Sequence, residues 1–262
     1  MINLAIAAGA MILVFVLFAL WLGGWAAIIP AVVTFMVAYF LLARRSGKQL
    51  TQVIERSMKH LEVLKVNPQR VTPQVLKLSL NKTISSLKTG YTLGRWQLMV
   101  KEQLDMQVGT MYFLLEDKKS ALDHLRAALG NERMAKIRGV MMPSNEGDAM
   151  AWAMYAVCLY HAKEIDTMLK ALQQGTSANP KISFIWAVGA WLCEDVKKRD
   201  RAVELLSEGV KNNPSDEGLK ANLNNLRNDK KLSMKPWGDM WYQLKLEPHP
   251  AAHVGPRPGF RR

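Results

Sequence analysis

Two long apolar runs open the chain before any charged residue appears. Residues 1–43 contain no Lys, Arg, Asp, Glu or His. The runs Ile2–Leu22 and Trp25–Ala43 hold 21 and 19 residues, and a helix needs about 20 apolar residues to cross the hydrocarbon core of a bilayer. Gly23 and Gly24 separate the two runs, and paired glycines favour a tight turn. The pattern therefore predicts a transmembrane helical hairpin over residues 1–43.

The alternatives for this apolar segment are a single tilted or re-entrant anchor and a cleaved signal peptide. A signal peptide has a basic start and an apolar stretch of about 7–15 residues, so the uncharged start and the much longer stretch argue against it. Arg44, Arg45 and Lys48 follow the second run, whereas the turn between the runs has no charge. By the positive-inside rule we expect residues 44–262 in the cytoplasm, on an integral protein of a bacterial inner membrane.

Most of the net charge of +13 lies directly after the apolar segment. Residues 44–101 carry twelve Lys and Arg against two acidic residues, while the other residues carry 23 against 20. Leu50, Ile54 and Leu61 recur at helical spacing among these cations, which predicts basic juxtamembrane helices over residues 44–101. Anionic lipid is a possible partner of such helices, and the candidate lipid-facing residues are Arg44, Arg45, Lys48, Lys59 and Lys65. A solvated polar face is the alternative, and nucleic acid is not expected as a partner because no recognisable binding motif accompanies the charge.

The clearest pattern in the rest of the chain is an internal repeat of 34 residues. Residues 152–180 match residues 186–214 at nine of 29 positions without a gap, whereas ordinary composition gives about two matches. The matched pairs are Trp152/Trp186, Ala153/Ala187, Ala156/Ala190, Lys163/Lys197, Asp166/Asp200, Leu172/Leu206, Gly175/Gly209, Asn179/Asn213 and Pro180/Pro214. The pattern indicates two helices in each copy, with a Pro closing the second helix.

This pattern resembles the tetratricopeptide repeat (TPR) family, whose 34-residue units have a large residue at position 4 and small residues at positions 8, 20 and 27. Positions 11 and 24 are aromatic or large and apolar, and position 32 is Pro. The two in-phase units supply Trp152, Ala156, Leu159, Met168, Leu172, Gly175 and Pro180, and then Trp186, Ala190, Cys193, Ala202, Leu206, Gly209 and Pro214. An earlier unit supplies Gly109, Tyr112, Ala121, Leu125 and Ala128, but it has Asp105 at the large position and Arg133 at the Pro position.

The resemblance implies an all-α fold, in which the transmembrane hairpin is followed by an α-solenoid of TPR-like helical hairpins. We expect the repeats and a polar capping helix over residues 102–235. An insertion is expected at Ala135–Glu146, where Gly and Pro break the helical pattern. Residues 236–262 then hold an aromatic segment and a disordered basic tail that begins near Pro248.

The resemblance also implies a binding surface, because TPR domains bind peptides or partner proteins in a concave groove lined by the first helix of each unit. Transferred residue by residue, the candidate groove residues are Met106, Thr110, Phe113, Met150, Val157, Tyr160, His161, Phe184, Trp191, Glu194 and Asp195. An apolar groove with an acidic end fits an amphipathic helix or an aromatic-rich strand with a basic residue. The alternative is that neighbouring helices bury some of these side chains.

The sequence contains no Walker-type glycine loop, dinucleotide fingerprint, nucleophile elbow or paired-His metal motif. Cys158 and Cys193 fall on the first helices of successive units, where small core residues are expected. We therefore expect no enzyme, no cofactor and no metal site. The predicted function is that of a membrane-anchored TPR adaptor or scaffold, which binds a protein partner on the cytoplasmic face. The alternative is a membrane-surface structural protein whose basic helices bind anionic lipid and whose repeats self-associate.

An aromatic segment follows the predicted capping helix. Residues 234–244 include Trp237, Trp241 and Tyr242, and each large aromatic ring buries roughly 150–250 Å² in a folded protein. Three interpretations remain open. The two Trp residues seal the end of the superhelix, occupy its groove near Phe184 and Trp191, or form an exposed motif for a partner.

Overall fold

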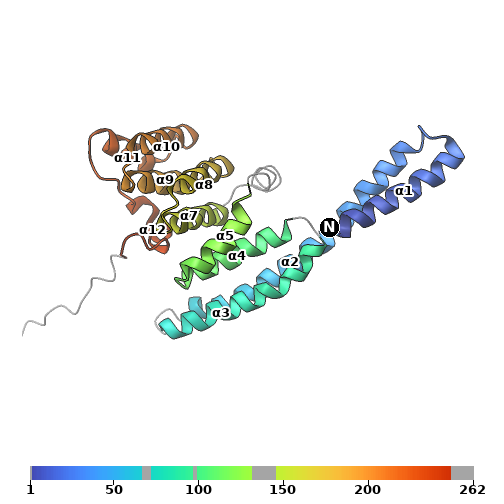
Figure 1. Ribbon diagram of the computed structural model, residues 1–262, viewed down its shortest axis with the longest axis horizontal. Helices are drawn as coiled ribbons and strands as arrows, with labels where there is room; N and C mark the ends of the chain where they lie inside the picture. The colour runs from blue at the N-terminus through green and yellow to red at the C-terminus, as the bar shows by residue number, and fades with distance from the viewer. Residues whose placement is uncertain (1, 67–71, 97–98, 132–145, 249–262) are drawn as a thin grey trace, which may run out of the picture. The chain divides into compact units, whose positions relative to one another are not determined.

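The computed structural model describes residues 2–66, 72–96, 99–131 and 146–248, and all regular structure in these ranges is helical, as the sequence predicted. The predicted tail after Pro248 and the predicted insertion at Ala135–Glu146 lie almost entirely outside the described residues. The chain divides into two compact units, residues 1–117 and 118–262. Figure 1 shows the order of the helices along both units.

The two apolar runs form a helical hairpin at the start of the first unit (Figure 1). α1 spans Ile2–Leu22 and α2 begins at Ile28, and the turn between them contains Gly23 with a φ of +84°. Glycine adopts this left-handed conformation without steric strain. Among the described residues, 24 large hydrophobic side chains are exposed, and 20 of these lie between Ile2 and Leu41. Both helices are long and apolar enough to cross a bilayer, judged by length and composition.

A buried polar contact closes the open end of this hairpin. The side-chain amide of Asn3 donates hydrogen bonds to Ser46 Oγ at 2.8 Å and to the Leu42 carbonyl oxygen at 3.3 Å. Asn3 and Ser46 are 2% and 5% exposed. Because a helix rises about 1.5 Å per residue, α1 is about 32 Å long and α2 covers about 27 Å from Ile28 to Ser46. These lengths match the hydrocarbon core of a bilayer, which is about 30 Å thick.

α2 continues without a break from the apolar run into the basic region. It spans Ile28–Val66, a length of 39 residues, so the predicted boundary between residues 43 and 44 lies inside one helix. The second half of α2 has a different environment, because Leu50, Ile54 and Met58 pack in a helical core. The basic region therefore begins as a continuation of the apolar helix, and one of its faces is covered by other helices.

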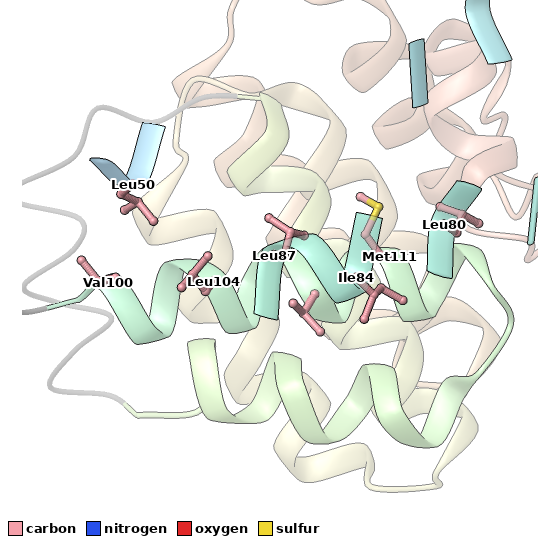
Figure 2. Packing of buried hydrophobic residues seen from close by; sticks show 8 residues of the cluster. Leu50, Leu80, Ile84, Leu87, Val100, Leu104 and Met111 are labelled. Carbon is pink, nitrogen blue, oxygen red and sulfur yellow. The ribbon is translucent and has the colours of Figure 1, made fainter. Parts of the chain in front are cut away.

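The core of the first unit is formed by the second half of α2, by α3 and by α4 (Figure 2). α3 spans Pro73–Thr89, the 3-10 helix η2 spans Gly90–Arg95, and α4 spans Val100–Leu114. At the start of α3, Thr72 Oγ1 accepts a hydrogen bond from the Val75 amide at 3.3 Å, which caps the helix. The buried residues of this core are Leu50, Leu80, Ile84, Leu87, Val100, Leu104, Val108 and Met111.

Hydroxyl and carboxyl groups join the helices inside the first unit. Ser57 is fully buried, and its Oγ lies 2.8 Å from Ser86 Oγ, so small polar side chains connect α2 and α3. The Tyr91 hydroxyl donates a hydrogen bond to Asp105 Oδ1 at 2.5 Å, and Asp105 is 4% exposed. Burial and the bond to Asp105 both raise the pKa of Tyr91. Asp105, which departs from the large residue of the TPR pattern, thus has a hydrogen-bond partner in η2.

The second unit contains successive helical hairpins followed by a short C-terminal helix (Figure 1). Its elements are α5 (Lys118–Leu129), α7 (Glu146–His161), α8 (Ile165–Ala178), α9 (Ser183–Asp195), α10 (Arg199–Asn212), α11 (Glu217–Arg227), η3 (Lys235–Trp237) and α12 (Gly238–Gln243). α7 packs against α8 and α9, and α9 packs against α10 and α11. The division between the units follows residue 117, between α4 and α5, which the sequence assigned to one repeat.

Gly90 gives a test of the packing in the first unit. A β-carbon at Gly90 would lie 3.1 Å from Leu104 Cδ1 and 3.1 Å from Val53 Cγ1, whereas the nearest atom to one at Gly94 is 3.5 Å away. We expect Gly90→Ala to lower the free energy of unfolding by about 1 kcal/mol, because overpacking has effects of this size. Gly94→Ala is the matched control and should change it by about 0.5 kcal/mol or less. Thermal unfolding in detergent micelles, followed by circular dichroism, measures both changes, and equal shifts would contradict the close packing at Gly90.

Candidate protein-binding site

The 34-residue repeat corresponds to a repeated contact between helices. A β-carbon at Gly175 in α8 would lie 3.0 Å from Trp152 Cβ in α7, and one at Gly209 in α10 would lie 2.9 Å from Trp186 Cβ in α9. In both hairpins, a Trp of the first helix therefore packs directly on a Gly of the second helix. Glycine permits this approach because it has no side chain. The predicted repeat thus appears as two equivalent helical hairpins.

The helices also end in equivalent turns. Glu116, Lys163, Lys197 and Asp229 follow α4, α7, α9 and α11, and their φ values lie between +55° and +65°. In each turn the N–H of this residue donates to the carbonyl three residues earlier, and the next N–H donates to the carbonyl five residues earlier. These paired bonds form the Schellman motif that terminates many helices. The first helices α4, α7 and α9 and the predicted capping helix α11 therefore end in the same backbone turn.

The structure divides the predicted groove residues into a buried and an accessible group. The buried residues are Met106, Phe113, Met150, Val157 and Phe184. The half-buried or exposed residues are Thr110, Tyr160, His161, Trp191, Glu194 and Asp195. The buried residues contribute to the interior instead of lining an open groove, which was the alternative that the sequence left open. Met106, Thr110 and Phe113 belong to α4 in the first unit, and the other residues belong to α7 and α9 in the second.

Accessible residues of α7 and α9 meet at the C-terminal ends of these helices. The Tyr160 hydroxyl donates to Asp195 Oδ2 at 2.6 Å, and the ring of Tyr160 lies edge-on to His161 with centroids 5.2 Å apart. The hydrogen bond to Asp195 and partial burial raise the pKa of Tyr160. Burial and the positive charges of Lys118 and Lys163 lower the pKa of His161, which favours the neutral form of its imidazole. The surface therefore offers an aromatic ring, an imidazole and a carboxylate to a partner.

Glu194 has a different role from its neighbours in the predicted groove. Its Oε1 forms an ion pair with Arg199 at 2.9 Å, and Arg199 also pairs with Asp229 Oδ1 at 2.7 Å. Arg199 thereby links the end of α9 to the turn that follows α11. Glu194 supports the contact between these hairpins, so its carboxylate is less available than that of Asp195.

The helix α9 also carries the aromatic C-terminal segment of the chain. The ring of Trp241 packs edge-on against Trp191, with centroids 5.1 Å apart and an interplanar angle of 64°. Trp237 Nε1 donates a hydrogen bond to Ser183 Oγ at 3.1 Å. Trp237 and Trp241 are 9% and 1% exposed, so the interpretation of this segment as an exposed motif is wrong. Because Trp191 is a predicted groove residue, the segment covers part of the predicted groove.

Further contacts of this segment were missed by the sequence analysis. The Asn222 side chain pairs with the backbone of Ser233, donating to its carbonyl at 2.9 Å and accepting from its N–H at 2.8 Å. A β-carbon at Gly218 would lie 3.0 Å from Pro236. Asn222 is only 1% exposed, although its polar character was interpreted as that of a solvent-facing capping helix. The sequence feature that could have predicted these contacts was the aromatic segment itself, because its large side chains are expected to pack against a nearby surface.

The predicted lipid-facing residues are spread along α2. Arg44, Arg45, Lys48 and Lys59 are exposed, and the side chain of Lys65 lies outside the described residues. Arg44 and Arg45 adjoin the base of the hairpin at Ser46. The helical rise places Lys59 about 20 Å and Lys65 about 29 Å farther along the helix. The five residues therefore do not form one patch.

The two cysteines lie in the interior of the second unit. Cys158 in α7 and Cys193 in α9 are free and buried. Burial raises the pKa of the Cys158 thiol to about 12 and that of the Cys193 thiol to about 11. Both thiols are therefore protonated at neutral pH, which makes them weak nucleophiles and poor metal ligands. Within the described ranges, no three His, Cys, Asp or Glu side chains are grouped so that they could hold a metal ion.

Comparisons with known proteins add little to this description. No family model matches the sequence, and no curated protein matches it. Among solved structures, the chain is similar to the crystal structure of MamA, with 18% sequence identity and a TM-score of 0.39. The similarity covers 65% of this chain and 92% of that chain. At these values it carries no conclusion about function, so the TPR-like character of the second unit depends on the repeated helix contacts.

Lys197 tests the turn that recurs in these hairpins. A non-glycine residue in the left-handed region is strained by about 1–2 kcal/mol, whereas glycine is not. We expect Lys197→Gly to raise the free energy of unfolding by up to about 1 kcal/mol, since the added chain entropy of glycine offsets part of the gain. Lys170→Gly, at an exposed position in the interior of α8, is the control and should lower it by about 0.5–1 kcal/mol. Thermal unfolding of both variants checks the signs, and destabilisation by both would contradict the strained turn.

Proposed function

We propose that this protein is a membrane-anchored adaptor, whose repeated helical hairpins bind a protein partner on the cytoplasmic side. The observation that carries the anchor is the exposed apolar surface of α1 and the first half of α2, which holds 20 of the 24 exposed large hydrophobic side chains among the described residues. Contiguous apolar surface of this extent is unfavourable in water and is typical of contact with lipid or protein.

The position of the polar groups supports the orientation. Asn3 and Ser46 pair at one end of the hairpin, and Arg44, Arg45 and Lys48 are exposed beside this pair. The turn at the other end has no charged residue and is flanked by Trp21 and Trp25, which are 88% and 90% exposed. Cations favour the cytoplasmic side, and Trp is enriched where a membrane helix meets water. These features support the proposal that the rest of the first unit and the whole second unit lie in the cytoplasm.

The length of α2 argues against the alternative, in which the whole basic region binds anionic lipid. Electrostatic attraction to a leaflet falls off within a Debye length, about 8 Å at physiological salt. Lys59 lies about 20 Å beyond the hairpin base, measured along the helix, and a tilt of 40° would still leave it about 15 Å from the base plane. Among the cations of α2, lipid contact is therefore proposed for Arg44, Arg45 and Lys48.

Binding is preferred to catalysis because of the chemistry of the accessible surface. The ends of α7 and α9 offer Tyr160, His161 and Asp195, which are suited to hydrogen bonding and ring contacts with a peptide. The nucleophilic side chains Cys158 and Cys193 are buried with raised pKa values. The resemblance to TPR units, whose first helices contact protein ligands, supports the same assignment.

The topology can be tested by cysteine labelling of the full-length protein in membranes. Gly24→Cys is suitable for the turn because a β-carbon there meets open space, and Ser215→Cys lies in an exposed turn of the second unit. We expect a membrane-impermeant maleimide to label position 24 only from outside and position 215 only from the cytoplasm. The native protein is the control and should remain unlabelled until it is unfolded, since both native thiols are buried. Labelling of both positions from the same side would exclude a transmembrane hairpin.

The adaptor function can be tested by photo-crosslinking in intact cells. A photoreactive residue at His161, which is exposed at the end of α7, should give a discrete protein adduct. The matched control is Glu208, which is exposed on α10 and lies on a second helix of a hairpin. Adducts formed equally at both positions, or at neither, would argue against partner binding at the ends of α7 and α9.

A further inference from the structure

The C-terminal segment places four apolar side chains on one face. Met234, Trp237, Trp241 and Leu244 are separated by three, four and three residues, which is the spacing of one helical stripe. They are 4%, 9%, 1% and 1% exposed. The residues between them that are exposed include Lys235, Asp239 and Gln243. Residues 233–247 therefore form an amphipathic segment whose apolar side is fully covered.

The surface that receives the two indole rings of this segment is a defined stretch of α9. Ser183 is the first residue of α9 and accepts the hydrogen bond from Trp237 Nε1. Trp191 lies eight residues later, about 12 Å along the helix, and contacts the ring of Trp241. One helix thus offers a hydroxyl for the first indole and an aromatic ring for the second. This arrangement receives two aromatic side chains that are four residues apart in the sequence.

The conformation of the segment depends on this docking. α12 contains only six residues, and isolated helices shorter than about 12 residues are marginal in water. Gly238, with a φ of +42°, separates η3 from α12, so the two Trp residues do not lie on one continuous helix. An undocked segment would therefore lose its structure. Its contacts with the rest of the second unit set the fraction of molecules in which the segment is docked.

The segment is joined to α11 by an exposed link, and its departure would break the Asn222–Ser233 pair and the contact between Gly218 and Pro236. Asn228, Asp229, Lys230 and Lys231 are exposed between α11 and Ser233. The Trp–Gly contacts within the α7–α8 and α9–α10 hairpins do not involve the segment. A segment tethered in this way acts at an effective concentration in the millimolar range. A free competitor must bind more tightly, or be concentrated by the same membrane.

We propose that the α9 face between Ser183 and Trp191 is a docking site for a partner segment with two aromatic residues four positions apart, and that residues 233–247 occupy this site exchangeably. The proposal deepens the adaptor function, on which it rests, by naming the chemistry of the partner segment. A partner of this kind replaces the ring contact with Trp191 and the hydrogen bond to Ser183. The chain's own segment then competes with this partner, and so sets the affinity that the partner needs in order to bind.

The test uses the full-length protein in lipid nanodiscs and a fluorescent synthetic peptide with the sequence of residues 233–248. In the Trp237→Ala/Trp241→Ala variant, residues 233–247 lack the two indole rings that hold them on α9. We expect this variant protein to bind the peptide at least about tenfold more tightly than the native protein does. Adding Trp191→Ala to this variant, or replacing both Trp residues of the peptide by Ala, should weaken binding by about 30-fold or more. Fluorescence anisotropy measures these affinities, and circular dichroism verifies that each variant is folded.

A second measurement keeps the site intact, in case the double variant does not fold. A protease site inserted between Lys230 and Lys231 allows the segment to be cut from α11 after folding. We expect an excess of the unlabelled peptide to release the cut fragment, whereas the peptide with both Trp residues changed to Ala should not release it. Retention of the fragment through prolonged competition would show a permanent seal of the hairpins and would overturn the proposal.

Other outcomes also decide between occupants. Equal peptide affinity of the native protein and a folded double variant would show that the peptide binds elsewhere and would overturn the proposal. A native dimer that the double variant does not form, measured by light scattering, would identify a second copy of this chain as the occupant in place of a partner segment. Peptide exchange is measured without any cellular partner, so its failure is distinguishable from a failure of the crosslinking experiment at His161.

Discussion

The continuity of α2 is the constraint on which the first unit depends. One stripe of this helix carries Ser46, Leu50 and Ser57, which are spaced by four and seven residues and therefore face the same way. Ser46 bonds to Asn3 at the base of the hairpin, Leu50 packs in the helical core, and Ser57 bonds to Ser86 in α3. A single stretch of backbone thus fixes the rotation of the apolar hairpin and that of the core helices. A rotation or shift of one part along α2 would disturb the contacts of the other.

The patterns of charged and apolar residues predicted the structure correctly where it depends on a property of neighbouring residues. The apolar runs predicted the ends of α1 and the turn at Gly23, because length and hydrophobicity determine whether a helix can lie in lipid. They did not reveal that α2 runs through residues 43 and 44. A change from apolar to charged residues marks a change of surroundings, and a helix can pass from one medium into another without ending. Separate juxtamembrane helices were inferred from a boundary in composition that the backbone does not share.

The repeat was predictable for a similar reason, whereas the accessibility of its residues was not. Trp152 and Gly175 recur as Trp186 and Gly209, because two helices approach closely only where a glycine faces the large ring. The same periodicity placed Val157 and Phe184 on the first helices of the hairpins, but both side chains are buried. Periodicity states which residues share a helix face. It does not state whether a distant segment, such as the one that brings Trp241 onto Trp191, covers that face.

The repeated turns and the docking of the C-terminal segment together restrict how repeat number can change during evolution. α7 and α9 end in the same backbone turn and pack their partner helices through the same Trp–Gly contact. A duplicated hairpin placed before α9 would therefore have equivalent hairpins as neighbours on both sides. A duplication between α10 and α11 is different. The link from α11 positions Trp241 against the hairpin that directly precedes it, so a new hairpin there would present its own first helix to the segment. The array can therefore lengthen towards its N-terminal side while its last hairpin keeps Ser183 and Trp191 opposite the two indoles.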